Sequence, residues 1–68
     1  MRIRVNGRDE ETDDSRFSVL DYLKRSRIRP ETVAIELNER VLEKRNYGAT
    51  YLKEADTMEI VRFVGGGA

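Results

Sequence analysis

The segment of residues 58–64, MEIVRFV, constrains the fold of this chain more than any other feature. Apolar side chains occur at both alternating sets of positions, which is typical of a central strand of a sheet. The chain has only 68 residues and no cysteine, so it forms one small domain without disulfide bonds. We therefore expect this segment to be a central strand of that domain.

A β-hairpin is predicted at the N-terminus. Residues 2–5 alternate between arginine and an apolar residue, which is the period of a half-buried strand. Asn6-Gly7 follows, and both residues tolerate the positive φ that a tight hairpin turn requires. We therefore expect a returning strand over residues 8–12, although its acidic composition is unfavourable for a strand.

Two further strands are predicted in the second half of the chain. Residues 33–38, VAIELN, alternate clearly between apolar and other positions, and residues 41–42 fit a short edge strand. Residues 46–48 and 54–57 are interpreted as turns because they combine asparagine, aspartate, glycine and small residues. We expect the side chains of Tyr22, Tyr47 and Tyr51 to pack with their hydroxyl groups at the surface.

A single helix is predicted to begin after Ser18, which is followed three residues later by Asp21 in the spacing of a capping box. Phe17 stands directly before the cap, where it can close the helix entry as a hydrophobic staple. Pro30 disfavours helical geometry at the residue before it, so the helix must end earlier. The apolar stripe of this helix consists of Val19, Leu20 and Leu23.

The expected order of elements is strand, strand, helix, strand, short strand, strand. The first and last strands are natural central partners, and their parallel pairing requires the crossover that the intervening elements supply. This order predicts an α+β fold of the β-grasp, or ubiquitin-like, architecture: a mixed sheet of four to five strands with one main helix packed across it. We expect residues 1–64 to form this domain and residues 65–68 to form a flexible glycine-rich tail.

The composition argues against several classes of function. Histidine and cysteine are both absent, so no imidazole base, thiolate nucleophile or metal site built on these ligands is expected. Thirteen basic residues balance thirteen acidic ones, which argues against nucleic acid or an anionic membrane as a partner. No convergent acid, base and nucleophile are visible, so we predict a protein that is not an enzyme and that binds no cofactor stably. The first residues, MRIRV, lack the long apolar region of a signal peptide, and no apolar run is long enough to span a bilayer, so we expect a cytoplasmic location.

Three consecutive glycines follow the predicted central strand. One interpretation is a flexible end without a role. The other is a thread: glycine has no Cβ, so the segment could enter a channel too narrow for side chains and deliver a terminal carboxylate to another protein's active site. The residues expected to thread a partner's active site are Gly65, Gly66 and Gly67.

The outer face of the sheet is expected to present Arg2, Arg4, Glu36, Val61 and Phe63. Apolar residues on an open face beside the tail indicate a docking patch for a partner protein. The alternative is that Val61 and Phe63 pack against one another and meet no partner. We predict docking through Phe63, Val61 and Arg4, with Phe63 foremost because aromatic residues dominate interface energetics.

Four segments, in this order, resemble the ThiS family of sulfur carriers, the small β-grasp proteins of thiamine biosynthesis. They are IRVNG at residues 3–7, VAIELN at residues 33–38, LKEADTMEIV at residues 52–61 and FVGGG at residues 63–67. Together they extend the resemblance over essentially the whole chain. None of these segments is specific alone, but their order, with diglycine at the end, makes the match fairly strong.

The resemblance implies a carrier cycle in which other proteins supply the catalysis. An E1-like partner uses ATP and magnesium to adenylate the C-terminal glycine carboxylate, and a persulfide protein donates the sulfur that converts it to a thiocarboxylate. Thiazole synthase then takes this sulfur into the thiazole ring of thiamine. In this sequence the modified residue is Gly67 if a peptidase removes Ala68, and Ala68 otherwise.

Two other functions stay open at this stage. One is a sulfur carrier for molybdopterin or another metabolite, although residues 63–67 resemble the thiamine group more closely. The other is a TGS-like β-grasp binding module, which needs no reactive C-terminus. Removal of Gly66 and Gly67 distinguishes them, because it abolishes a carrier's function and leaves a binding module nearly unaffected.

Two turns depart from the family's pattern. Glu39 and Ala55 stand where the family often has glycine. If either turn requires positive φ, the non-glycine residue costs about 1 kcal/mol.

Overall fold

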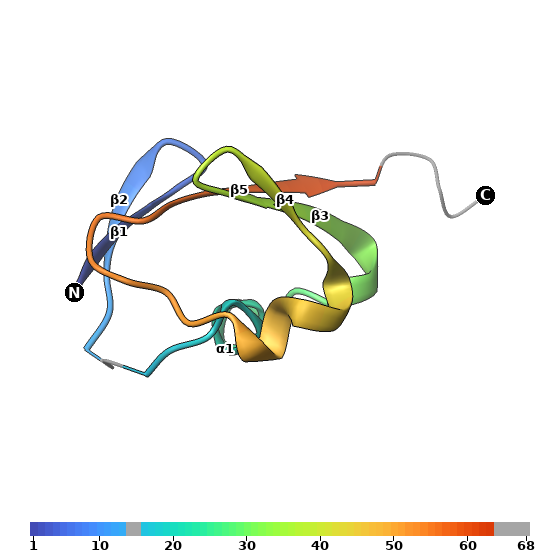
Figure 1. Cartoon of the computed structure of the whole chain (residues 1–68), viewed down its shortest axis with the longest axis horizontal. Coiled ribbons are helices and arrows are strands. Elements are labelled where there is room, and N and C mark those ends of the chain that lie inside the picture. The colour runs from blue at the N-terminus through green and yellow to red at the C-terminus, as the bar shows by residue number, and fades with distance from the viewer. Residues whose placement is uncertain (14–15, 64–68) are drawn as a thin grey trace.

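The computed structural model of the protein describes residues 1–13 and 16–63. The described chain forms a five-stranded mixed sheet in the order β2-β1-β5-β3-β4, with one α-helix and the longer of two 3-10 helices on one of its faces (Figure 1). This confirms the predicted β-grasp architecture. The elements are β1 (Arg2–Val5), β2 (Arg8–Glu11), α1 (Val19–Arg25), η1 (Pro30–Thr32), β3 (Val33–Leu37), β4 (Arg40–Leu42), η2 (Lys44–Ala49) and β5 (Thr57–Arg62).

Strand β5 is the central strand, as its sequence predicts. It runs parallel to β1, with Val5 opposite Met58, and antiparallel to β3, with Val33 opposite Arg62. The strand ends at Arg62, two residues before the end of the predicted strand 58–64. The reason is that β3 begins at Val33 and offers no further residue for pairing. Phe63 lies just beyond the strand, where its backbone N–H still donates to the carbonyl of Thr32 at 3.1 Å.

Helix α1 begins as the sequence predicts. The backbone N–H of Asp21 donates to Ser18 Oγ at 2.9 Å, and the N–H of Ser18 donates to Asp21 Oδ2 at 3.0 Å, which completes a capping box. The hydrogen bonds from Ser18 hold the pKa of the Asp21 carboxyl below its ordinary value. Phe17 packs edge-on against Tyr22 with ring centroids 6.5 Å apart, so the predicted staple is present.

The helix ends in a Schellman motif without glycine. The N–H of Ile28 donates to the carbonyl of Leu23 at 2.8 Å, and the N–H of Arg27 donates to that of Lys24 at 3.0 Å. This geometry places Arg27 in the left-handed region, with φ of 59°. The helix has therefore ended before Pro30, as predicted.

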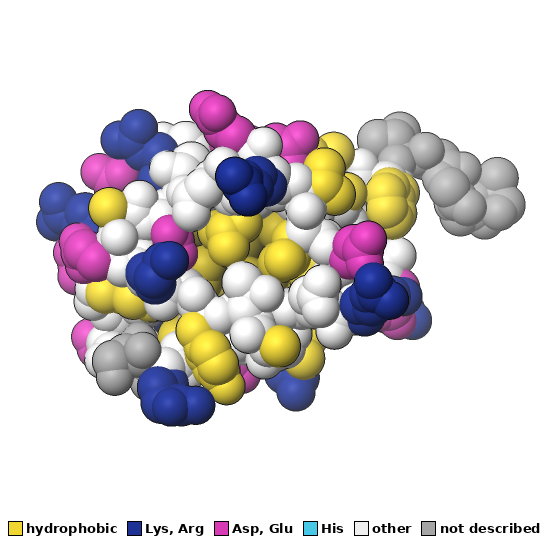
Figure 2. All heavy atoms as spheres, in the orientation of Figure 1, with side chains coloured by type: hydrophobic (Ala, Val, Ile, Leu, Met, Phe, Trp, Pro, Cys, Tyr) yellow, Lys and Arg dark blue, Asp and Glu magenta, His cyan; other side chains and the backbone are white. Residues whose placement is uncertain are grey.

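The core lies between the sheet and the two helices, and Figure 2 shows hydrophobic side chains gathered at the centre of this side view with charged side chains around them. It joins residues from both ends of the described chain. Among the described residues, no helix is long and apolar enough to cross a membrane. The buried hydrophobic residues are Ile3, Val5, Phe17, Val19, Tyr22, Leu23, Val33, Ile35, Tyr47, Leu52 and Met58.

The interpretation of residues 46–48 as a turn was wrong. These residues belong to the 3-10 helix η2, and Tyr47 is only 3% exposed because it fills the core beside β3. Its hydroxyl donates to the buried carbonyl of Val33 at 3.5 Å instead of reaching the surface, and burial raises the pKa of Tyr47. Asparagine and glycine favour turns locally, but burial of a large aromatic side chain decides this segment.

Candidate functional site

The predicted reactive end of the chain lies outside the described residues, together with Val64 and the whole of the tail 65–68. Among the residues that the structure describes, the site is therefore the surface from which this end departs. That surface consists of the end of β5, Phe63, and the neighbouring strands of the sheet (Figure 1). This surface is what the described residues contribute to the predicted C-terminal site.

Asn6 fixes the end of β5 on the side that faces β1. Strand β1 ends at Val5, so the second half of β5 has no further strand residue to pair with on this side. The Asn6 side chain takes the place of the missing strand residue. Its Oδ1 accepts from the N–H of Ile60 at 2.7 Å, and its Nδ2 donates to the carbonyl of Ile60 at 3.3 Å. The backbone N–H of Asn6 also donates to the carbonyl of Met58 at 2.9 Å. A left-handed φ of 51° places the side chain for these contacts.

Asn38 fixes the beginning of β5 from the opposite side. Its backbone N–H donates to the carbonyl of Thr57 at 2.7 Å, and its Oδ1 accepts from the N–H of Thr57 at 3.0 Å. Its Nδ2 donates to the buried carboxylate of Asp56 at 2.9 Å, and this carboxylate also accepts from the N–H of Lys53 at 2.7 Å. Asn38 also has positive φ, at 53°. Two asparagines at strand ends thus position the central strand from both sides.

An apolar patch lies on the exposed sheet face beside the root of the tail. Val61 is 56% exposed and stands opposite Ala34 of β3, while Phe63 is 60% exposed. Val41 of β4, which is 77% exposed, extends the patch toward the edge of the sheet. We refer to the four residues Ala34, Val41, Val61 and Phe63 as the apolar patch. The prediction that Val61 and Phe63 face outward is confirmed.

A shallow groove of about 300 Å³ adjoins the apolar patch at the sheet edge. It forms because β4 pairs only with residues 35–37 of β3, so the beginning of β3 has no strand on the side away from β5. Phe63 and Val41 line this groove together with Pro30 and Lys44. Concave apolar surface therefore lies directly beside the last described residue.

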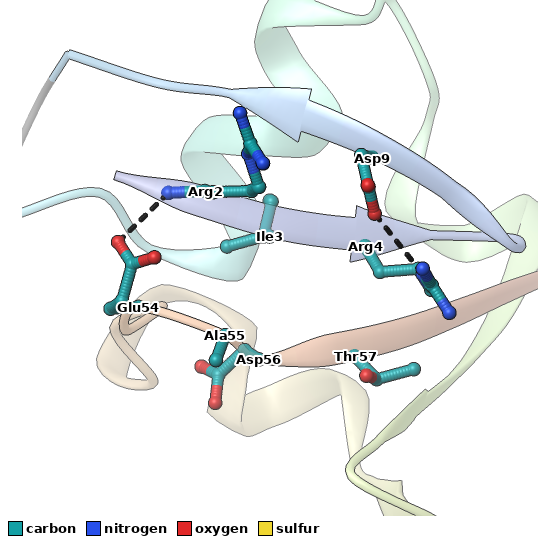
Figure 3. Close-up of a pocket in the computed structure, with 8 residues that line it drawn as sticks. All are labelled: Arg2, Ile3, Arg4, Asp9, Glu54, Ala55, Asp56 and Thr57. Atoms are coloured by element: carbon teal, nitrogen blue, oxygen red, sulfur yellow. Dashed lines mark hydrogen bonds and ion pairs between the residues drawn. The ribbon is translucent and has the colours of Figure 1, made fainter.

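Arg4 also faces outward but lies away from the apolar patch. It stands opposite Thr57, the first residue of β5, whereas Phe63 follows the last. Its Nε lies 3.1 Å from Asp9 Oδ1, and Figure 3 shows the two side chains pointing toward one another. The structure therefore brings Val61 and Phe63 to one place and Arg4 to another.

A second hollow, of about 310 Å³, lies around Arg4 and is lined by Arg2, Ile3, Arg4, Asp9, Glu54, Ala55, Asp56 and Thr57.

The remaining predicted features have a structural explanation. Glu39 has φ of 69° and Ala55 has φ of 72°, so both turns adopt the conformation that favours glycine.

Sequence reasoning did not identify the side-chain contacts of Asn6 or the position of Glu59 opposite Glu36. The alternation of each strand indicates which residues share a face, but the register between strands is needed to place any two of them together. Among the described residues no group of three potential metal ligands is found.

The strand order, the single capped helix across one face and the central last strand define a ubiquitin-like β-grasp protein. Comparison of the sequence gives the particular family. The chain belongs to the ThiS family, whose sequence profile matches residues 3–67.

Relatives of known name agree with this assignment. The chain is 31% identical over 65 residues to the sulfur carrier protein ThiS of Bacillus subtilis, which covers 96% of this chain and 98% of that protein. It is 36% identical over 67 residues to a thiazole synthase of Magnetococcus marinus, where the match covers 98% of this chain and only 20% of that protein. This chain thus corresponds to about a fifth of the Magnetococcus protein.

A solved structure has the same fold. The crystal structure of the thiamine biosynthesis protein ThiS from Geobacter metallireducens superposes with a TM-score of 0.85 at 35% sequence identity. The match covers 98% of this chain and 100% of the Geobacter chain. The β-grasp fold is therefore shown over nearly the whole length.

Proposed function

We propose that this protein is a sulfur carrier of thiamine biosynthesis, whose C-terminal carboxylate is activated and converted to a thiocarboxylate by partner enzymes. Its membership of the ThiS family is the observation that carries the proposal. The Bacillus relative of nearly equal length is named a sulfur carrier protein, and a matching segment occurs within a thiazole synthase. We infer that this chain carries the sulfur that a thiazole synthase uses to form the thiazole ring.

The proposed chemistry begins at the terminal carboxylate. One of its oxygens attacks the α-phosphorus of ATP on an E1-like enzyme that holds Mg²⁺, and pyrophosphate leaves. The terminal sulfur of a protein persulfide then attacks the acyl carbon, and AMP leaves with the electron pair of the broken C–O bond. A thiol cleaves the resulting acyl disulfide, which leaves the thiocarboxylate on the carrier and a disulfide on the donor side. Adenylation gives the acyl carbon a good leaving group, displacement of AMP forms the C–S bond, and the last step releases the anionic sulfur nucleophile.

The chain itself contributes position rather than catalysis in this proposal. The sheet and the two asparagine contacts hold β5 rigidly, so the tail starts from a fixed point. The exposed apolar patch beside that point gives a partner a surface to bind. The glycines at 65–67 provide the narrow thread, and Gly67 carries the sulfur if Ala68 is removed; otherwise Ala68 does.

Mass spectrometry of the C-terminal peptide tests this proposal. The protein is incubated with the E1-like enzyme of the same organism, ATP, Mg²⁺ and a persulfide donor, with or without a cell extract that supplies a peptidase. We expect replacement of one oxygen by sulfur at Gly67 after loss of Ala68, or at Ala68 if no trimming occurs. A chain that ends at Gly65 is the control and should stay unmodified. An unmodified C-terminus in the full-length protein under all these conditions contradicts the proposal.

A further inference from the structure

Two carboxylates face each other in the middle of the exposed sheet face. Glu36 of β3 and Glu59 of β5 are direct partners in the antiparallel register, and both side chains are exposed. Like charges directly opposite each other on neighbouring strands destabilise a sheet. We call Glu36 and Glu59 the acidic pair. The pairing therefore does not stabilise the free protein, whereas a positive charge placed beside both carboxylates would relieve their repulsion.

The other charges of the same face are already neutralised. The two arginines of β1 each form an ion pair of 3.1 Å with a carboxylate of β2. Within the described parts of the chain, no Lys or Arg nitrogen lies within the 4.0 Å of an ion pair from either member of the acidic pair. The face is therefore electrically neutral over β1 and β2 and negative over β5 and β3. The two internal pairs are Arg2 with Glu11 and Arg4 with Asp9.

The acidic pair directly adjoins the apolar patch. The next outward-facing pair toward the tail is Ala34 opposite Val61, and Val41 stands opposite Glu36 on the other side. Exposed apolar area and unpaired negative charge thus lie side by side near the root of the tail. A protein surface complementary to both has an apolar centre with a basic side chain at its border.

We propose that the partner that binds this face presents an arginine or lysine to the acidic pair, so that Glu36 and Glu59 select and orient the E1-like enzyme on the carrier. This proposal rests on the proposed function. A second copy of this chain does not fit the same face, because it would bring four carboxylates together, and like charges across an interface are strongly unfavourable. A basic partner instead relieves the repulsion that the free carrier carries.

Two isosteric substitutions test the proposal. The variants are Glu36→Gln, Glu59→Gln and the double substitution, each of which removes negative charge while preserving the shape of the side chain. The matched control is Glu39→Gln, which removes one exposed carboxylate from the turn outside this face. The dissociation constant for the E1-like enzyme of the same organism is measured by calorimetry at about 0.05 and 0.3 M NaCl, between which screening increases strongly. We expect the double variant to bind about tenfold more weakly at low salt and to lose most of the salt dependence of the wild type.

The stability of the free protein separates recognition from a structural role. Removal of the repulsion should leave the melting temperature of the double variant unchanged or higher, while its binding weakens. Binding equal to the wild type at both salt concentrations overturns the proposal, as does a lower melting temperature or a Glu39→Gln variant that is equally impaired. Failure of the wild-type protein to be activated at all contradicts the proposed function instead, so the two failures are distinguishable.

Discussion

At the scale of single residues, three positions adopt a backbone conformation that their side chains disfavour. Arg27, Glu39 and Ala55 have φ between 59° and 72°, and none of them is glycine or asparagine. The left-handed region costs such residues about 1 kcal/mol each because Cβ approaches the following carbonyl oxygen. The surrounding hydrogen bonds outweigh this cost; at Ala55, for example, the N–H donates to the carbonyl of Arg2 at 2.8 Å.

Ala55→Gly is therefore expected to stabilise the protein. Relief of the strain exceeds the extra entropy of glycine in the unfolded chain, which leaves a net gain of about 0.5–1 kcal/mol in the free energy of unfolding. Thermal and urea denaturation followed by circular dichroism measure this gain. Ala34→Gly is the matched control, since Ala34 lies in extended β3 and its replacement should destabilise by about the same amount. Destabilisation by both substitutions would show that the turn at residue 55 does not carry the strain.

At the scale of elements, the second half of β5 depends on the side chain of Asn6. Asn6→Gly preserves the left-handed backbone and removes only the amide contacts to Ile60. We expect faster hydrogen exchange at the Ile60 amide and a loss of about 1–2 kcal/mol in the free energy of unfolding, because two hydrogen bonds of about 1 kcal/mol each are removed. Asn38→Gly is the counterpart, because it should instead expose the amide of Thr57. Equal acceleration at both amides in both variants would mean that the strand opens as one unit.

The sequence predicts most elements because their signals are local. The alternation of residues 2–5 and 33–38, and the Ser18 to Asp21 spacing, each lie within a few neighbouring residues, and the corresponding elements are observed. The helix η2 was not predicted, because its formation depends on burial of Tyr47 against β3, far away in the sequence. The exposed positions of Val61 and Phe63 were predicted from alternation, whereas the acidic pair requires the register of two strands that are not adjacent in the chain.

At the scale of the whole molecule, the core that the structure describes is built from residues that precede the predicted tail. Among residues 1–13 and 16–63, all buried core residues lie between Ile3 and Met58, and the last strand pair joins Val33 to Arg62. We therefore expect stability to depend on the described body and the proposed reactivity to depend on residues 65–68. This division explains how the proposed carrier could present a chemically changing end without altering the surface that its partners bind.

A chain that ends at Gly65 separates the two parts directly. Because every core residue that the structure describes is retained, we expect its melting temperature to stay within about 2 °C of the full-length protein, while its modification by the E1-like enzyme is abolished. Differential scanning calorimetry measures the first effect and mass spectrometry the second. A decrease of more than about 4 °C, equivalent to about 1 kcal/mol in a domain of this size, would show that residues 66–68 contribute to the folded body. An unchanged melting temperature with full loss of modification assigns these residues to the reaction alone.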